Sequence, residues 1–195
     1  MQPSRRSVLK ALGALAAMPW LIPANRAFAA APMRIGVIGA GWLGGTVGRL
    51  WVKAGHEVMF SSRNPDKLEA MARELGPRAS VGLPMAAAEF GTVLLLAVPF
   101  EALPQVGRDL RSAYRGKIVL DSTNPWGANR ADVYREAREL GVAQTVVKYM
   151  PGARLVRAFS AVDATVVETS ASRAGGRIGM PIASDDAEAM RVAAQ

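Results

Sequence analysis

The chain has 195 residues, of which 24 are basic and 16 acidic, and it carries a formal net charge of +8 and no cysteine. Disulfides, thiol nucleophiles and cysteine-based metal sites are therefore excluded, and the single histidine, His56, excludes a histidine-rich metal site, so no metal is expected. Four basic residues lie within the first 29, which leaves 20 basic against 16 acidic residues beyond them, without a basic run interleaved with aromatic residues, and nucleic acid is not an expected partner.

The first 29 residues are typical of a targeting segment. Arg5 and Arg6 lie in a basic stretch, followed by an apolar run over residues 11–24 and by Ala27-Phe28-Ala29, a small-x-small cleavage pattern. The apolar run is short for a membrane span, and two prolines interrupt it. We therefore predict a twin-arginine-like signal peptide over residues 1–29, a periplasmic or otherwise exported protein, and no stable membrane span after cleavage. An uncleaved anchor and a general secretory signal are the alternatives.

A glycine-rich turn follows the leader. Residues 34–38 predict a buried strand, residues 42–54 predict a helix, and between them lies the pattern Gly39-x-Gly41-x-x-Gly44. In a dinucleotide site the first glycine permits the tight turn, the second lets the backbone approach a pyrophosphate, and the third lets the helix pack on the strand. The N–H groups of the new helix would face the phosphates. The predicted cofactor-binding residues here are Gly39, Ala40, Gly41, Trp42, Leu43 and Gly44.

The loop after the second predicted strand, residues 56–60, indicates which dinucleotide binds. A site for NAD would carry an acidic residue there, whereas this chain has Ser61-Ser62-Arg63-Asn64-Pro65-Asp66-Lys67. A hydroxyl, a guanidinium and an ammonium would bind a 2′-phosphate through charge-assisted hydrogen bonds, so Ser62, Arg63 and Lys67 are predicted to select NADP. Asn64 followed by Pro65 is typical of an N-cap and first helical residue. The alternative is a solvated basic loop.

The remaining pattern alternates helix and strand, which predicts an α/β fold with a doubly wound, mostly parallel sheet and helices on both faces. Residues 30–195 are expected to form one NADP-binding Rossmann domain, incomplete at its carboxyl end. The last predicted helix follows the capping-type residues Ser184 and Asp185. Helices are expected over residues 65–75, 85–90, 101–114 and 131–140, and strands over residues 78–81, 92–98, 117–121, 154–159 and 177–182.

Three loops at the carboxyl ends of the strands are expected to line the nicotinamide side: residues 98–100, 123–126 and 158–160. Val98, Pro99, Asn124 and Pro125 are their predicted cofactor-binding residues. Acid–base catalysts are scarce. His56, Lys148 and Tyr149 fall at the amino ends of strands, and Asp121 is expected to cap the following loop, so catalytic residues stay unknown. Hydride transfer between two bound cofactors needs little acid–base help and is therefore favoured.

Five segments of the sequence resemble the NADPH-dependent reductases of the deazaflavin coenzyme 420. They are the glycine turn, the run Ser62-Arg63-x-x-x-Lys67, the strand end Ala97-Val98-Pro99, Ser122-Thr123-Asn124-Pro125 and Leu155-Val156-Arg157-Ala158-Phe159-Ser160. The resemblance covers Met33 to the end of the chain. It implies that Ser62, Arg63 and Lys67 hold the 2′-phosphate, that a deazaflavin or flavin is the small-molecule redox acceptor, and that the protein forms a homodimer.

Two alternatives remain at this point. A β-hydroxyacid or similar alcohol dehydrogenase would need a lysine after the sixth strand, and no lysine follows Lys148. A non-catalytic NADP-binding or redox-sensing module would need only the nucleotide site.

Overall fold

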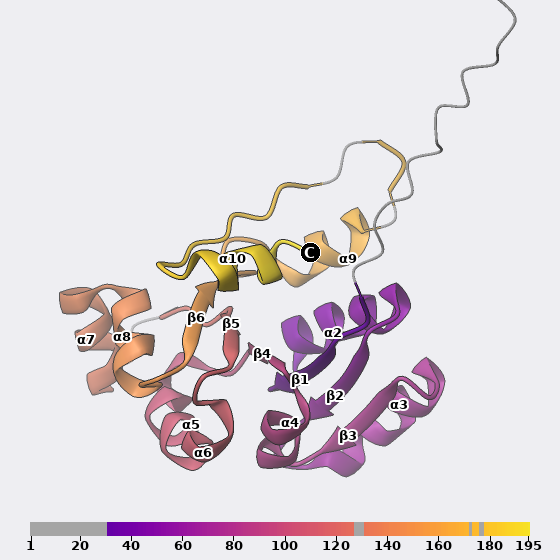
Figure 1. Ribbon diagram of the computed structural model, residues 1–195, viewed down its shortest axis with the longest axis horizontal. Helices are drawn as coiled ribbons and strands as arrows, with labels where there is room; N and C mark the ends of the chain where they lie inside the picture. The colour runs from indigo at the N-terminus through magenta and orange to yellow at the C-terminus, as the bar shows by residue number, and fades with distance from the viewer. Residues whose placement is uncertain (1–30, 127–130, 172, 176–177) are drawn as a thin grey trace, which may run out of the picture. The chain divides into compact units, whose positions relative to one another are not determined.

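Six parallel strands form one sheet in the part of the chain that the computed structural model describes, residues 31–126, 131–171, 173–175 and 178–195 (Figure 1). The strand order is β3-β2-β1-β4-β5-β6. This is the doubly wound order, in which β2 and β3 lie on one side of β1 and the later strands lie on the other. The predicted fold class is confirmed. The predicted signal peptide lies outside the described residues. The strands are β1 (Arg34–Ile38), β2 (Glu57–Ser61), β3 (Ala79–Gly82), β4 (Val93–Leu96), β5 (Ile118–Asp121) and β6 (Arg154–Arg157).

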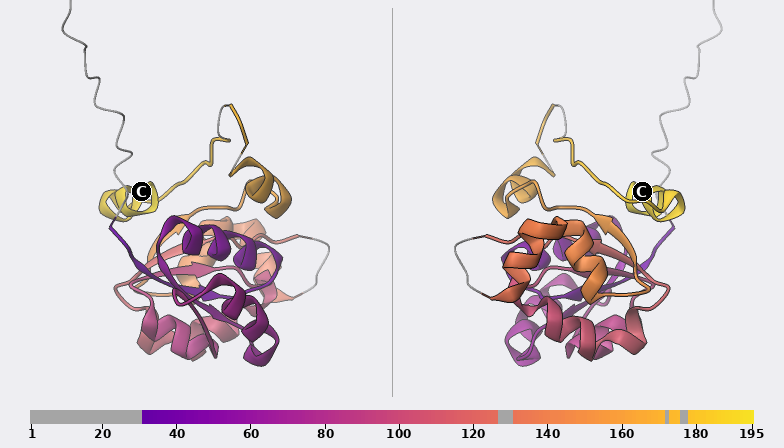
Figure 2. Two further views of the ribbon diagram at one scale, coloured as in Figure 1. Left: turned by 90° about the vertical axis from the view of Figure 1, so that its right-hand side faces the viewer. Right: turned by 90° about the vertical axis from the view of Figure 1, so that its left-hand side faces the viewer.

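Helices cover both faces of this sheet, as Figures 1 and 2 show. One core contains Val47, Val52, Val167 and Ala189, so α2, α3, α9 and α10 lie on one face, with Met71 of α3 packed beside them. The other core contains side chains of α4 to α8. The helices are α2 (Trp42–Ala54), α3 (Glu69–Leu75), α4 (Pro84–Phe90), α5 (Leu103–Asp109), α6 (Arg111–Tyr114), α7 (Asp132–Leu140), α8 (Val142–Tyr149), α9 (Ala164–Ser170) and α10 (Ala187–Ala193), with short 3-10 turns η1 (Pro65–Leu68) and η2 (Phe100–Ala102).

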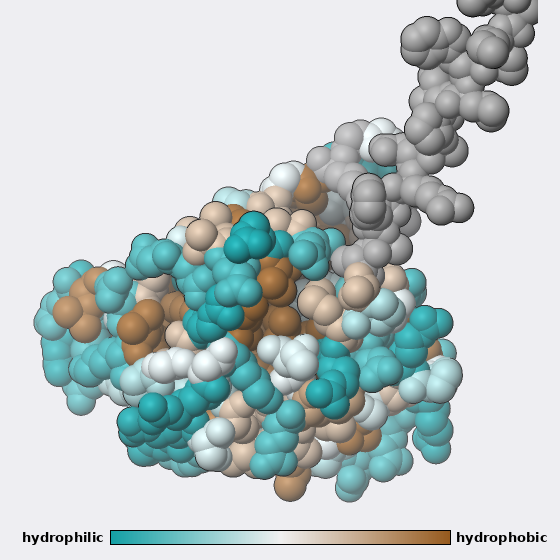
Figure 3. Space-filling view, in the orientation of Figure 1, coloured by the Kyte–Doolittle hydropathy of each residue, from teal (hydrophilic) through white to brown (hydrophobic). Residues whose placement is uncertain are grey.

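The surface shown in Figure 3 is mostly hydrophilic, with a small group of apolar residues in its middle. This agrees with a sheet whose apolar strands are covered on both faces. Among the described residues, the structure contains no helix with the length and apolar character needed for a membrane span.

The bounds of β1 and α2 agree with the prediction, whereas several other elements differ. The helix predicted over residues 101–114 is divided into η2, α5 and α6, with the break at Leu110. The helix predicted over residues 65–75 begins with the 3-10 turn η1. Asn64 does not cap this turn through its side chain, and its backbone N–H donates to Ser62 Oγ at 3.1 Å.

The last predicted strand is wrong over its described residues, 178–182, which adopt no strand. Pro181 lacks an N–H donor, and a single antiparallel bridge between Arg157 and Ala183 takes the place of a seventh strand. The following helix is capped by Asp186, whose carboxylate accepts from the N–H groups of Glu188 and Ala189, and not by Asp185. Two helices, α8 and α9, had no counterpart in the prediction.

Lys117, immediately before β5, joins this strand to the end of α4. Its Nζ donates to the carbonyl oxygens of Ala88, Glu89 and Gly91 at 2.7, 3.1 and 2.8 Å. A cation at a helix carboxyl end satisfies carbonyls that lack partners within the helix. We expect Lys117→Met to lower the unfolding free energy by about 1–3 kcal/mol. Urea denaturation would measure this, with the exposed Lys53→Met as the matched control, and equal midpoints for the two variants would contradict the capping role.

Candidate functional site

The glycine turn between β1 and α2 lies at the point where the strand order reverses. Gly39 has a φ of +96°, which favours glycine, and an added Cβ would collide with the carbonyl oxygen of Ala97. The backbone N–H of Ala40 donates to the Ser61 carbonyl at 2.8 Å. The turn is thereby held to the ends of both neighbouring strands.

The other two glycines differ in the space around them. A Cβ added to Gly44 would collide with the carbonyl oxygen of Gly39 and lie 3.1 Å from the Ala97 Cβ, so α2 packs closely on β1. A Cβ added to Gly41 would meet no atom within 4 Å. The space beside Gly41 is therefore open on the side where a pyrophosphate would approach.

The amino end of α2 is free to bind an anion. Its N-cap, Gly41, offers no capping side chain, and the first turn contains no acidic residue. The exposed N–H groups and the positive end of the helix dipole thus remain for a phosphate. A cavity of about 390 Å³ begins here and is lined by Ala40, Gly41, Trp42, Gly45, Thr46, Arg49, Lys67, Leu68, Met71 and Glu168.

Of the three residues predicted to hold the 2′-phosphate, Lys67 lines this cavity, whereas Ser62 and Arg63 do not. Arg63 and Lys67 are both exposed, and within the described residues neither forms an ion pair with a carboxylate. Ser61, the residue before them, is the buried last residue of β2, and its hydroxyl donates to the Val37 carbonyl at 2.6 Å.

A second cavity, of about 410 Å³, lies on the other side of Trp42, over the ends of β5 and β6. The structure brings Trp42, Leu43 and Asn124 of the predicted set to it, together with residues that follow β6. Its lining is Trp42, Leu43, Ser122, Asn124, Trp126, Phe159, Ser160, Ala161, Val162, Asp163 and Ala164. Three aromatic side chains among a few hydroxyl and amide groups suit a flat ring system.

The loop after β4 contributes less than expected. Val98, Pro99 and Pro125 are absent from the described lining of both cavities, although they lie at the same edge of the sheet. Phe100 does not face a cofactor: it is 1% exposed and packs edge to face on Tyr134 with ring centroids 5.6 Å apart. This ring belongs to the core because η2 turns the chain back against α7 immediately after Pro99.

An ion pair that the sequence did not predict lies next to the loops that line the second cavity. Arg157, at the end of β6, binds the fully buried carboxylate of Asp121 and donates to the Thr123 carbonyl at 2.6 Å and to Asn124 Oδ1 at 2.9 Å. Asp121 also accepts from the Thr123 N–H at 2.9 Å, so it caps the loop as predicted. Asn124 in turn donates to the Ser160 carbonyl at 2.6 Å. Arg157 thus fixes the loops after β5 and β6 to each other.

Comparison with known proteins agrees with this geometry. Residues 34–125, which span β1 to the loop after β5, match the family described as NADP oxidoreductase, coenzyme F420-dependent. The resemblance to the deazaflavin-dependent NADP reductases is confirmed. The family match supports NADP(H) as the cofactor and an NADP-dependent oxidoreductase as the class of enzyme.

Solved structures share this fold over most of the chain. A hypothetical protein from Sinorhizobium meliloti is 22% identical with a TM-score of 0.69, covering 86% of this chain and 80% of its own. A protein from Arthrobacter sp. FB24, provisionally assigned as an F420-dependent NADP-reductase, is 20% identical with a TM-score of 0.65, covering 83% and 78%. Glycerol-3-phosphate dehydrogenase from Coxiella burnetii is 16% identical with a TM-score of 0.63, covering 83% of this chain and 50% of its own.

The acid–base candidates lie away from both cavities. His56 precedes β2, and its Nδ1 accepts from the Met33 N–H at 3.2 Å, while burial lowers the pKa of its imidazole. Lys148 forms an ion pair with Glu136 at 2.9 Å, and Tyr149 ends α8, before β6 begins. Among the described residues, no cluster of three metal-ligating side chains occurs.

Phe159 belongs to the third loop predicted to line the nicotinamide side, but its backbone conformation was not predicted. Its φ of +58° lies in the left-handed region, which a bulky side chain rarely adopts. The ring packs edge to face on Trp51 of α2 with centroids 5.7 Å apart. This conformation places Phe159 beneath the second cavity and turns the chain toward Ser160.

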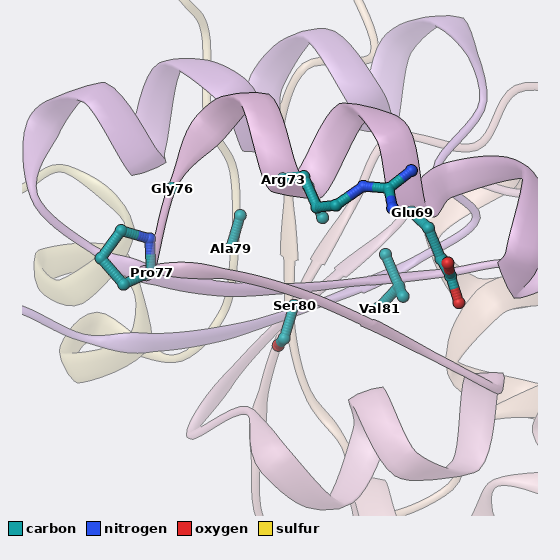
Figure 4. Close-up of a pocket in the computed structure, with 8 residues that line it drawn as sticks. Glu69, Arg73, Gly76, Pro77, Ala79, Ser80 and Val81 are labelled. Atoms are coloured by element: carbon teal, nitrogen blue, oxygen red, sulfur yellow. The ribbon is translucent and has the colours of Figure 1, made fainter.

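Another cavity, of about 490 Å³, lies between α3 and the edge strand β3 (Figure 4). Glu69 and Arg73 come from α3, and Ser80 and Val81 come from β3. Its described lining contains no residue of the glycine turn or of the loops after β4, β5 and β6. It is therefore separate from the two cavities that adjoin Trp42.

Proposed function

We propose that the protein transfers hydride between NADPH and a flat, flavin- or deazaflavin-like acceptor. The observation that carries this proposal is the position of Trp42, which lines both cavities at the amino end of α2. One cavity adjoins the glycine turn and contains Lys67, and the other is lined by Trp42, Trp126 and Phe159. A dinucleotide and a flat ring would therefore meet beside the same side chain.

The protein's part in this reaction is to position the two reactants. The glycine turn and the first turn of α2 would hold the pyrophosphate, and Trp42 with the Asn124 loop would hold the rings. NADPH supplies the hydride, the acceptor receives it together with a proton from water, and NADP⁺ leaves. No covalent bond to the protein forms. Correct placement of two reacting groups alone accounts for large rate enhancements.

The affinities of the protein for NADPH and for NADH test whether NADPH is its cofactor. We expect Arg63→Ala and Lys67→Ala each to raise the dissociation constant for NADPH by about tenfold or more, because each would remove a charge-assisted hydrogen bond to the 2′-phosphate. The constant for NADH should change by less than about twofold. Calorimetric titration of the 195-residue chain would measure both. Equal affinities of the unchanged protein for NADPH and NADH would show that the loop is only a solvated turn.

Mixing NADPH with a deazaflavin or a flavin tests the acceptor half. Loss of NADPH absorbance with reduction of one acceptor would support it. Tight NADPH binding without oxidation by either acceptor would instead support the non-catalytic NADP-binding or redox-sensing module.

We also propose that residues 1–29 export the protein through a twin-arginine route and are then removed. The basis is the sequence pattern around Arg5, Arg6 and Ala29. Amino-terminal sequencing of exported protein, with and without Arg5→Lys and Arg6→Lys, would test the boundary.

A homodimer is a further proposal that rests on the family resemblance, and sedimentation equilibrium would test it.

A further inference from the structure

The cavity beside the glycine turn contains charges that the sequence motif does not include. Arg49 enters it from α2, one turn after Thr46, and faces the same space as Lys67. Glu168 enters from α9, which packs against α2. Two cations and one carboxylate therefore line a cavity of about 390 Å³ that begins at Gly41.

In the part of the chain that the structure describes, none of these three charges is neutralised by an ion pair. Within residues 31–126, 131–171, 173–175 and 178–195, neither Arg49, Lys67 nor Glu168 takes part in an ion pair. Charged side chains that line a cavity without forming ion pairs with one another can donate to, or accept from, a ligand in that cavity. Arg63, the cation that the motif pairs with Lys67, is absent from this lining.

We propose that Arg49 is a second specificity-determining cation for the adenosine 2′-phosphate of NADP, and that Glu168 opposes the binding of that phosphate. This inference rests on the proposed NADP-dependent function. A guanidinium presents two parallel N–H donors to a phosphate, which Lys67 alone cannot do. The Glu168 carboxylate lies in the same cavity, so its charge repels a phosphate dianion and lowers the affinity.

The chain offers a matched control for Arg49. Lys53 lies one turn further along α2, is also exposed, and carries the same charge. It lines the neighbouring cavity between α2 and α3 but not the one that begins at Gly41. If a positive charge anywhere on this part of α2 were enough, Arg49→Ala and Lys53→Ala would therefore lower the affinity for the phosphate ligand equally.

The experiment is calorimetric titration of the 195-residue chain with adenosine 2′,5′-bisphosphate and with 5′-AMP. These ligands differ by the 2′-phosphate and lack the nicotinamide. We expect Arg49→Ala to weaken the bisphosphate by about tenfold or more and 5′-AMP by less than about twofold. Lys53→Ala should change neither ligand by more than about twofold, and Glu168→Gln should strengthen the bisphosphate by about threefold or more.

Equal effects of Arg49→Ala and Lys53→Ala, or equal weakening of both ligands by Arg49→Ala, would overturn the inference. Thermal unfolding of each variant shows whether it is folded. If the Arg49→Ala protein does not fold, the bisphosphate affinity of Glu168→Gln provides an independent test. The failure of this inference is distinct from that of the proposed function. If the unchanged protein does not prefer the bisphosphate to 5′-AMP, NADP selection itself is wrong. If it does, and Arg49→Ala keeps the preference, only the role of Arg49 is wrong.

Discussion

Replacing Arg157 by methionine is expected to lower the unfolding free energy by about 3–5 kcal/mol, because the Asp121 carboxylate would remain buried without its counter-ion. Asp121 is fully buried, and the Arg157 side chain is 17% exposed, so water screens this ion pair little. The variant would also lose the hydrogen bonds to the Thr123 carbonyl and to Asn124 Oδ1. The second cavity should loosen as a result. Urea denaturation measures the first effect, and turnover with the acceptor measures the second.

A second substitution separates the buried charge from lost packing. Asp121→Asn in the Arg157→Met chain keeps an oxygen for the Thr123 N–H and removes the uncompensated charge, so it should recover part of the lost stability. Arg154 provides the matched control, since it also lies in β6 and forms an ion pair, but its partner Asp186 is partly exposed. If Arg157→Met and Arg154→Met lowered stability equally, burial of the Asp121 charge would not be the cause.

Gly44→Ala and Gly41→Ala are expected to have opposite consequences, although the two positions are three residues apart. The Cβ at position 44 would collide with the Gly39 carbonyl, so α2 must move away from β1, at a cost of about 1–3 kcal/mol or more. The Cβ at position 41 meets no atom, so stability should change by less than about 0.5 kcal/mol. That methyl group would instead occupy the space for the pyrophosphate and raise the NADPH dissociation constant by about tenfold or more.

Thermal unfolding and NADPH titration of the same two variants measure these effects. Gly45→Ala is the control for stability, because its Cβ would lie 3.7 Å from the Ala40 carbonyl oxygen, an ordinary contact, and alanine favours a helix. A Gly41→Ala protein that bound NADPH as tightly as the unchanged protein would remove the glycine turn from the cofactor site.

Local features of the fold could be predicted from the sequence, whereas long-range ones could not. The glycine turn and the bounds of β1 and α2 depend on residues close together in the chain, and both were predicted correctly. The strand predicted near Met180 was wrong because an apolar run does not reveal whether a partner strand is free to pair with it. Helices α8 and α9 were missed because they have only eight and seven residues, although Asp163 is a typical N-cap residue and caps α9.

The candidate site shows the same division. The predicted parallel sheet places the loops after its strands at one edge, and Asn124 donates to the Ser160 carbonyl across 36 residues of sequence there. Arg49 and Glu168 belong to no recognisable motif, since their place depends on which side chains lie across a cavity. Arg157 lies in a motif of the family resemblance, but its ion pair with Asp121 depends on the pairing of β5 with β6. Phe100 could equally face a ligand or the core, and only the turn at η2 decides between them.

Trp42 has one more consequence for how the protein works. Because its indole is 66% exposed and forms part of both cavities, a rotation that accommodates a molecule in one changes the shape of the other. Two ligands that share a wall in this way are thermodynamically linked, and linkage is reciprocal: whatever factor NADPH applies to the acceptor's affinity, the acceptor applies to NADPH. The effect of each molecule on the affinity for the other would then depend on the position of the Trp42 side chain.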